Sequence, residues 1–134
     1  MIPISARYGP RDSGKGTARD ASDAIITAEV TMAPFSGIEH KVVSMNSRAC
    51  TEISLAIRRC FKHVIITSLY PRSVISIHCT ILQSDGGELS CCLNASLLAL
   101  IDAGVDIEDF QISIEVGYMD NTILLGICVG PASL

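Results

Sequence analysis

The feature that most constrains the fold of this chain is a change of hydrophobic period between residues 73 and 104. The run SVISIHCTIL (73–82) alternates apolar and polar side chains, which predicts a strand with one buried face. The acidic glycine turn QSDGG follows. The next run, ELSCCLNASLLALIDAG, predicts an almost wholly apolar helix that starts near Leu89 and stops at Gly104. A strand, a tight turn and a buried helix in succession are typical of an α/β layer.

Other stretches of the chain extend this layer. Apolar residues recur at helical spacing from Arg48 onward, which predicts an amphipathic helix with Ser47 as its N-cap and Pro71 just past its end. Further strands are predicted at IPISARY (2–8), AIITAEVTMA (24–33), FQISIEVGY (110–118) and ILLGICVG (123–130), the last two joined by a turn at 119–122. The expected order is strand, strand, helix, strand, helix, strand, strand, with both helices stacked on one sheet.

Length and composition predict one domain with more apolar residues than its core can bury. The 134 residues predict a single domain, 1–134, in which the polar stretch RDSGKGTARDASD (11–23) is a flexible loop. Hydrophobic residues make up 49% of a chain that can bury only about two-thirds of its unfolded surface, which predicts a surface meant for a partner. The net charge of −4 argues against a strongly basic nucleic-acid binder, and we expect no DNA partner. It leaves room for a local basic groove.

The cysteines predict reduced thiols and no metal site. They form no CxxC pair, and no His stands at zinc-ligand spacing, so we expect mostly buried thiols in an intracellular protein without a cofactor. The sequence has no signal-peptide pattern and no apolar run long enough for a membrane span, so we expect a soluble protein without a membrane partner. The six cysteines are Cys50, Cys60, Cys79, Cys91, Cys92 and Cys128.

The block LYPRSVISIHCTILQSDGGELSCCLNASLLALIDAG (69–104) resembles the RNase PH family, and within it the RNase PH-like subunits of the RNA exosome ring. The family has a VLQ-D-GG turn followed by an A-x-x-N-A-x-x-x-AL-x-DAG helix. Residues 82–83, 85–87, 94–95, 99–100 and 102–104 match these motifs. YGP (8–10) and PFS (34–36) match upstream family segments, and LSCCLNA also resembles a sister ring subunit.

The resemblance covers about residues 8–125 and implies the fold. We expect an RNase PH-like layer, similar to domain 2 of ribosomal protein S5, with a mixed β-sheet and helices packed on one face. Family members begin with further strands and continue into more strands and a long helix. The resemblance therefore implies that this chain is shortened at both ends.

The resemblance also implies that the catalytic groups are missing. Family enzymes cleave the 3′ end of RNA with inorganic phosphate as the nucleophile. The resemblance implies two requirements for this reaction: a Ser/Thr–Arg pair after the glycine turn that binds the phosphate, and an acidic pair after the next hairpin. Here Glu88 and Leu89 occupy the first pair of positions, and Gly126 occupies the first acidic position. We therefore expect a structural turn at a vestigial phosphate site, formed by Asp85, Gly86, Gly87, Glu88 and Leu89.

The leading hypothesis is a non-catalytic subunit of the exosome ring that contributes to RNA binding and to 3′–5′ RNA processing and degradation, including that of rRNA. Its partners would be other RNase PH-like subunits, RNA-binding cap subunits and single-stranded RNA, in the cytoplasm, nucleus and nucleolus. The candidate RNA-binding residues are Lys41, Arg48, Arg58 and Arg59, each equally explained as a solvated surface charge. Two alternatives remain open: a phosphate-dependent exoribonuclease completed by a partner subunit, and a purely scaffolding α/β module.

Four polar side chains in the predicted helices and strands have structural roles in this interpretation. Asn94 is expected to be a core amide that fixes loop geometry, with RNA contact as the alternative. Asp102 is expected to hold the loop that follows its helix. His63 and His78 are expected to be structural, because no second metal ligand accompanies either one.

Overall fold

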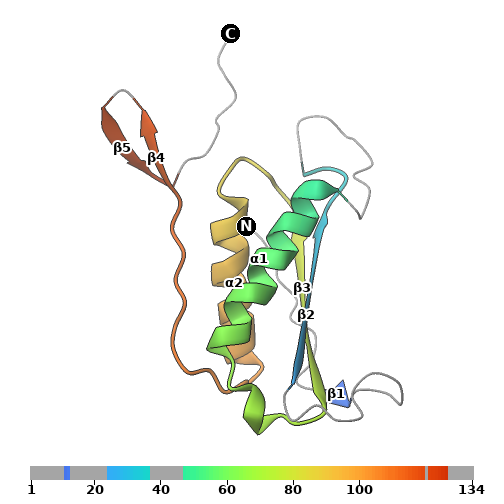
Figure 1. Ribbon diagram of the computed structural model, residues 1–134. Coiled ribbons are helices and arrows are strands. Elements are labelled where there is room, and N and C mark those ends of the chain that lie inside the picture. The colour runs from blue at the N-terminus through green and yellow to red at the C-terminus, as the bar shows by residue number, and fades with distance from the viewer. Residues whose placement is uncertain (1–10, 13–23, 37–46, 120, 127–134) are drawn as a thin grey trace.

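The computed structural model describes residues 11–12, 24–36, 47–119 and 121–126 (Figure 1). The strand predicted at 2–8, most of the loop predicted at 11–23, and the candidate Lys41 lie outside these residues.

A three-stranded sheet of order β1-β3-β2 forms the base of the molecule. Strands β2 (Ile25–Met32) and β3 (Ser73–Ile81) run parallel over their whole length, so the chain between them crosses over through a helix. The short strand β1 (Arg11–Asp12) pairs antiparallel with the start of β3. The prediction that the flexible loop starts at residue 11 is therefore wrong for its first two residues, because they take up the free edge of β3.

The crossover helix α1 (Arg48–Val64) begins where the sequence predicts. The Ser47 hydroxyl accepts a hydrogen bond from the Cys50 amide at 3.3 Å, which caps the first turn. The helix ends before Pro71, however. Ile65 is buried in an extended conformation and bridges to Ile107, and a separate 3-10 turn (Thr67–Leu69) follows. The helix ends early because Ile65 is buried and pairs with Ile107, and no feature of the neighbouring sequence predicts this.

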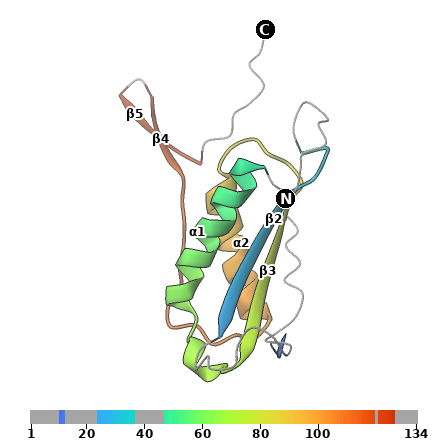
Figure 2. The same ribbon diagram turned by 45° about the vertical axis from the view of Figure 1, so that its right-hand side comes forward.

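Both helices cover the same face of β2 and β3, as Figures 1 and 2 show from two sides. The predicted alternation of β3 is confirmed, since its odd-numbered residues from Ile75 to Ile81 are buried against the helices. Helix α2 (Glu88–Asp102) buries one flank in this core and ends at Gly104, whose φ of 68° is the predicted left-handed termination. The core is aliphatic around a fully buried Phe61.

The segment after α2 departs from the predicted single sheet. Residues 110–115 are extended but pair with no strand among the described residues, and only β4 (Val116–Met119) and β5 (Thr122–Leu125) form a hairpin. This hairpin is a separate two-stranded sheet that stands away from the helices (Figure 1). We call residues 110–119 and 121–126 the arm. Apolar and polar residues do alternate along the arm, but no described element packs on its exposed apolar face.

Candidate functional site

The glycine turn between β3 and α2 has the backbone that its sequence predicts. Gly86 and Gly87 have φ of 108° and 69°, which side chains rarely allow. Gly87 is also the residue before α2, and it caps the helix without a side-chain hydrogen bond. A Cβ added to Gly87 would lie 3.0 Å from Oε2 of Glu115. The turn therefore needs glycine for its conformation rather than for room, since the Glu115 side chain is flexible enough to move away from an added Cβ.

Hydrogen bonds from neighbouring residues stabilise the turn. The Ser84 amide donates to the Ser36 carbonyl at 2.9 Å, and the Ser84 hydroxyl donates to the Glu88 carboxylate. The Gln83 side-chain amide donates to Asp85, and the Ser90 hydroxyl donates to the Gly87 carbonyl at 2.9 Å. Glu88 thus has a structural partner, and a carboxylate in the first turn also favours the helix dipole by ~0.3–1 kcal/mol.

An acidic cavity of about 600 Å³ lies beside the turn. Helix α1, the start of α2 and the arm each contribute one carboxylate to it, Glu52, Glu88 and Glu115, and none of its described lining residues is Lys, Arg or His. The described residues that line it are Ala49, Glu52, Ile53, Gly86, Gly87, Glu88, Leu89, Ser90, Ser113, Ile114 and Glu115. Sequence reasoning found Glu88 but missed Glu52 and Glu115, because only the tertiary fold brings these two to the turn.

The position compared with the catalytic acid lies next to the same cavity. Gly126 follows β5 with φ of 66°, and its amide donates to the Glu115 carbonyl at 3.0 Å. Gly126 is therefore bonded to one residue that lines the cavity, but it is not itself among the described lining residues.

The basic candidates do not gather at the cavity. Arg48, Arg58 and Arg59 are exposed on α1, and the Arg48 Nε donates to Oε1 of Glu52 at 2.9 Å, so an acid neutralises part of its charge. Arg59 lies eleven positions after Arg48 on the helix, which is about 16 Å along the axis. These side chains form a spaced row on one helix and no pocket.

Asn94 has the structural role predicted for it. Its Nδ2 donates to the Ser113 carbonyl at 2.8 Å, and its Oδ1 accepts from the Ser113 amide at 2.8 Å, so α2 fastens the arm. The prediction for Asp102 is wrong, because its side chain is exposed and makes no hydrogen bond to any described residue of the loop. Tyr70 holds that loop instead: its hydroxyl donates to Asp106 Oδ2 at 2.9 Å and accepts from the Asp106 amide at 3.1 Å.

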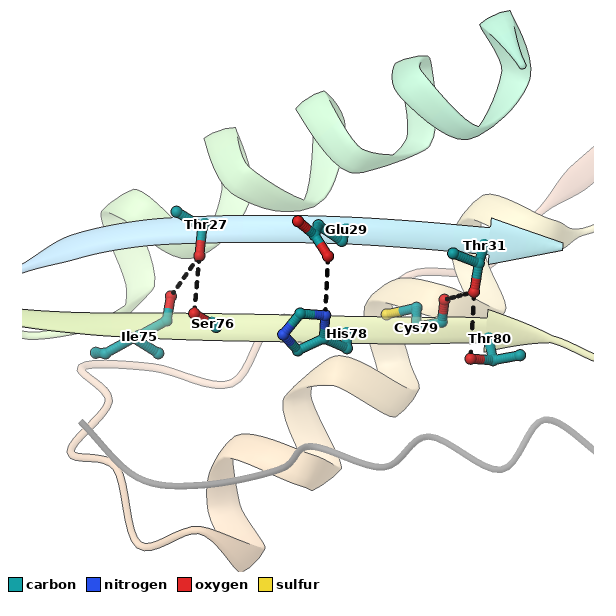
Figure 3. Close-up of polar contacts among 8 residues, drawn as sticks. All are labelled: Thr27, Glu29, Thr31, Ile75, Ser76, His78, Cys79 and Thr80. Atoms are coloured by element: carbon teal, nitrogen blue, oxygen red, sulfur yellow. Dashed lines mark hydrogen bonds and ion pairs between the residues drawn. The ribbon is translucent and has the colours of Figure 1, made fainter. Parts of the chain in front are cut away.

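The sheet face opposite the helices carries polar pairs between β2 and β3 (Figure 3). The Thr27 hydroxyl donates to Ser76 Oγ at 3.0 Å, and two steps along, His78 Nδ1 lies 3.2 Å from Glu29 Oε2. The structural interpretation of His78 is thereby confirmed. Within the described ranges, no three His, Cys, Asp or Glu side chains are grouped to hold a metal ion, and neither helix has the length and apolarity to cross a bilayer.

Cysteines are free throughout the part that the structure describes, and three of them, Cys50, Cys79 and Cys92, are buried. Cys91 is exposed, which departs from the expectation of buried thiols, while Cys128 lies outside the described residues. Cys79 on β3 contacts Ser96 on α2 at 3.2 Å and shares a hydrogen bond with Cys92. The Cys92 contact lowers the pKa of Cys79 to about 7 against the opposing effect of burial, and it raises the pKa of Cys92 together with burial.

A parallel β-α-β unit with a second helix on the same face defines the class as an α/β protein. The same architecture occurs in the crystal structure of rice (Oryza sativa) Rrp46, with a TM-score of 0.75 over 91% of this chain and 55% of that one. At 20% identity this likeness shows the fold alone.

Sequence comparison gives the family. The RNase PH model, described as the 3′ exoribonuclease family, domain 1, matches residues 4–106. The chain is 40% identical to the exosome complex component RRP41 homolog of Arabidopsis thaliana over 91% of its length. It is 37% identical to RRP41 of Homo sapiens over 90%. The chain belongs to the RNase PH family. It spans about half the length of these relatives, 51% and 50% respectively.

Proposed function

We propose that this chain is a non-catalytic RNase PH-like subunit of an RNA exosome ring. The relatives named above are exosome complex components, which supports the complex. The observation that carries the non-catalytic role is the acidic cavity at the glycine turn. There, Glu52, Glu88 and Glu115 surround the space in which a phosphate would have to bind.

Electrostatics and hydrogen bonding both disfavour phosphate in this cavity. A phosphate at neutral pH is an anion, and the carboxylates of Glu88 and Glu115 would raise its free energy, while Arg48 is paired with Glu52. None of the described lining residues carries a guanidinium that could clamp it bidentately. Leu89 has no polar atom in its side chain. Gly126 has no carboxyl group to move a proton or bind a metal. These residues support a site that has the glycine turn but not the groups that phosphorolysis would require.

As a ring subunit, the chain would pack against other RNase PH-like subunits and would work with RNA-binding cap subunits. The exposed apolar residues of α2, Leu98 and Ile101, are suited to such a contact. Single-stranded RNA would follow the basic row of Arg48, Arg58 and Arg59, together with Lys41. The chain would act in 3′–5′ RNA processing and degradation, including that of rRNA, in the cytoplasm, nucleus and nucleolus.

One observation favours an enzymatic alternative. The cavity of about 600 Å³ remains open beside the turn, and Gly126 lies at its edge. A partner subunit that inserted an arginine and a carboxylate there would complete a phosphorolytic site. The scaffolding alternative requires only that the basic row binds no RNA.

The test of catalysis is the release of nucleoside diphosphates from a single-stranded RNA 3′ end, with and without inorganic phosphate. We expect no phosphate-dependent release by the unmodified chain. The double variant Glu88→Thr, Leu89→Arg should bind phosphate more tightly, because it removes a repulsive charge and adds a clamp, yet it should still release nothing. Leu55→Arg adds the same charge on exposed α1 and should leave phosphate binding unchanged. Phosphate-dependent release by the unmodified chain alone would overturn the proposal.

The test of RNA binding is its salt dependence. A chain that contacts RNA phosphates should lose affinity as salt rises, with a log–log slope of about −0.7 for each phosphate neutralised on a single strand. Replacing Arg58 and Arg59 by Ala should make that slope shallower. Repeating the catalytic assay with a neighbouring ring subunit present separates the shared-site alternative from the non-catalytic role.

A further inference from the structure

A cluster of three small polar side chains lies in the core where β3 packs on α2. Cys79 on β3, and Cys92 and Ser96 on α2, are 1%, 0% and 0% exposed. The Cys79 Sγ lies 3.2 Å from the Ser96 Oγ, and the Ser96 hydroxyl donates to the Cys92 carbonyl at 2.6 Å. Cys92 and Ser96 are four residues apart on the helix and therefore share one face. Cys79 thus faces the turn of α2 that carries Cys92.

The two thiols of this cluster are in contact with each other. The Cys79 side chain shares a hydrogen bond with that of Cys92. The alternation of β3 directs Cys79 toward the helices, and Cys92 lies on the buried flank of α2. Packing between a central strand and its covering helix therefore fixes the contact, and no exposed face of the chain takes part in it.

The other described cysteines are placed differently. Cys50 and Cys60 lie on α1, and Cys91 is exposed although it precedes the buried Cys92 on α2. Successive residues of a helix point about 100° apart, which gives these two neighbours different environments. A single buried thiol behaves as a small apolar side chain. Two buried thiols in contact can be oxidised as a pair.

The contact also gives the two thiols different protonation states. The hydrogen bond from Cys92 lowers the pKa of Cys79 to about 7, and the same bond, together with burial, raises the pKa of Cys92. The thiolate is the nucleophilic form of cysteine. At neutral pH, Cys79 therefore supplies a thiolate that lies beside the protonated thiol of Cys92.

We propose that Cys79 and Cys92 are a redox-sensitive pair, which a hydroperoxide oxidises to a disulfide that joins β3 to α2. The Cys79 thiolate attacks one peroxide oxygen, the O–O bond breaks, and Cys79 becomes a sulfenic acid as hydroxide leaves. The Cys92 sulfur then attacks the Cys79 sulfur, and the sulfenic hydroxyl leaves as water with the Cys92 proton. In total, two thiols and hydrogen peroxide give one disulfide and two waters. Exchange with a thiol reductant reverses the reaction.

The disulfide would fasten the glycine turn. It closes a loop of residues 79–92, which contains Gly86 and Gly87. A crosslink of this kind stabilises the folded state mainly by restricting the unfolded chain. Oxidation would therefore make the strand, the turn and the helix harder to separate, and reduction would release them. This switch is independent of whether the chain cleaves or binds RNA.

The test maps disulfides in the full chain after native treatment with hydrogen peroxide and alkylation of the remaining thiols. Cleavage after Arg72 and Glu88 isolates Cys79 in peptide 73–88, and further cleavage after Glu108 leaves Cys91 and Cys92 in peptide 89–108. We expect these peptides to be linked, with a mass two hydrogen atoms below their sum, and to separate in dithiothreitol. Urea denaturation of the oxidised chain should show an equilibrium constant for unfolding about tenfold or more below that of the reduced chain.

Variants assign the bond to its two sulfurs. Cys92→Ala should abolish the link, while Cys91→Ala and the buried-thiol control Cys50→Ala should keep it. Because a change at Cys92 can disturb the core, fragmentation of the linked peptides from the unmodified chain provides a second assignment. Oxidation in urea should lose the preference for Cys92 over Cys91.

Three results would overturn the proposal. The first is that peroxide oxidises the exposed Cys91 while Cys79 and Cys92 remain free thiols. The second is that Cys79 links to Cys91 as readily as to Cys92 in the native chain. The third is that the disulfide forms but leaves the equilibrium constant for unfolding unchanged.

Discussion

The helical body and the arm of this molecule contain the same aliphatic side chains in opposite environments. Ile57 on α1 and Ile77 on β3 are 0% and 2% exposed, whereas Ile112 and Ile114 on the arm are 75% and 68% exposed. Burying such a side chain is worth about 1.5–3 kcal/mol. In the body, the parallel crossover places a helix over each apolar strand face. Among the described residues, the arm has neighbours along one edge and none over its apolar face, so its exposed side chains contribute little to folding.

The largest test of this contrast compares two phenylalanines. Phe61→Ala empties the fully buried centre of the core and should lower the free energy of unfolding by about 3–5 kcal/mol. Phe110→Ala makes the same chemical change on the arm, where the ring is 66% exposed, and should change it by roughly 0.5 kcal/mol or less. Urea denaturation measures both. Equal losses would mean that the apolar row of the arm is buried.

The link between the two regions is the next target. Asn94→Ala removes both hydrogen bonds to Ser113 and should cost about 1–3 kcal/mol, since the part-buried backbone of Ser113 loses both of its bonds to α2. Hydrogen exchange of the Ser113 amide should accelerate, while exchange in β3 should change little. Asn94→Asp keeps an acceptor for that amide and should have a smaller effect. Uniform acceleration across the chain would show that arm and body unfold together.

The buried thiols of Cys79 and Cys92 in the body should make the free energy of unfolding depend on pH. Because the folded pKa of Cys79 is lowered from 9.0 to about 7, the unfolded chain holds more protons between these values, and stability should rise with pH across them. Above pH 9 it should fall, because the raised pKa of Cys92 keeps a proton that the unfolded chain loses.

The rise in the free energy of unfolding between about pH 7 and pH 9 should be roughly 1–3 kcal/mol. Denaturant unfolding in a reducing buffer measures it. Cys79→Ala removes the pair and should flatten the profile, while the exposed Cys91→Ala should leave it intact. A flat profile for the unmodified chain would show that the thiol contact does not select the charged form of Cys79.

The smallest effect is expected at the loop where the body leads toward the arm. Tyr70→Phe removes the hydroxyl that bonds both to the Asp106 carboxylate and to its amide, and should cost about 0.5–1.5 kcal/mol. Asp102→Ala, at the end of α2 just before the loop, is the control and should be nearly neutral. Thermal unfolding of both variants measures the difference. A larger loss of stability for Asp102→Ala than for Tyr70→Phe would show that Asp102 does hold the loop that follows its helix.

Local signals predicted the elements whose causes are local. The Ser47 cap, the alternation of β3, the positive φ of the glycine turn and the Gly104 termination depend on neighbouring residues, and each was predicted correctly. The early end of α1 at Val64 was missed, because Ile65 leaves the helix to pair with Ile107 far along the chain. The pairing of 110–115 was wrongly predicted because alternation shows that a segment has two faces. It does not show that a neighbour covers either of them.

The sequence by itself determined the α/β layer and the family, since hydrophobic periods and motif residues carry both. Only the tertiary structure decided that Glu52 and Glu115 join Glu88 around one cavity, and that Gly126 lies beside it through the Glu115 carbonyl. The physical reason is that charge and shape at a site depend on distances through space. The fold sets those distances by packing α1, the glycine turn and the arm together.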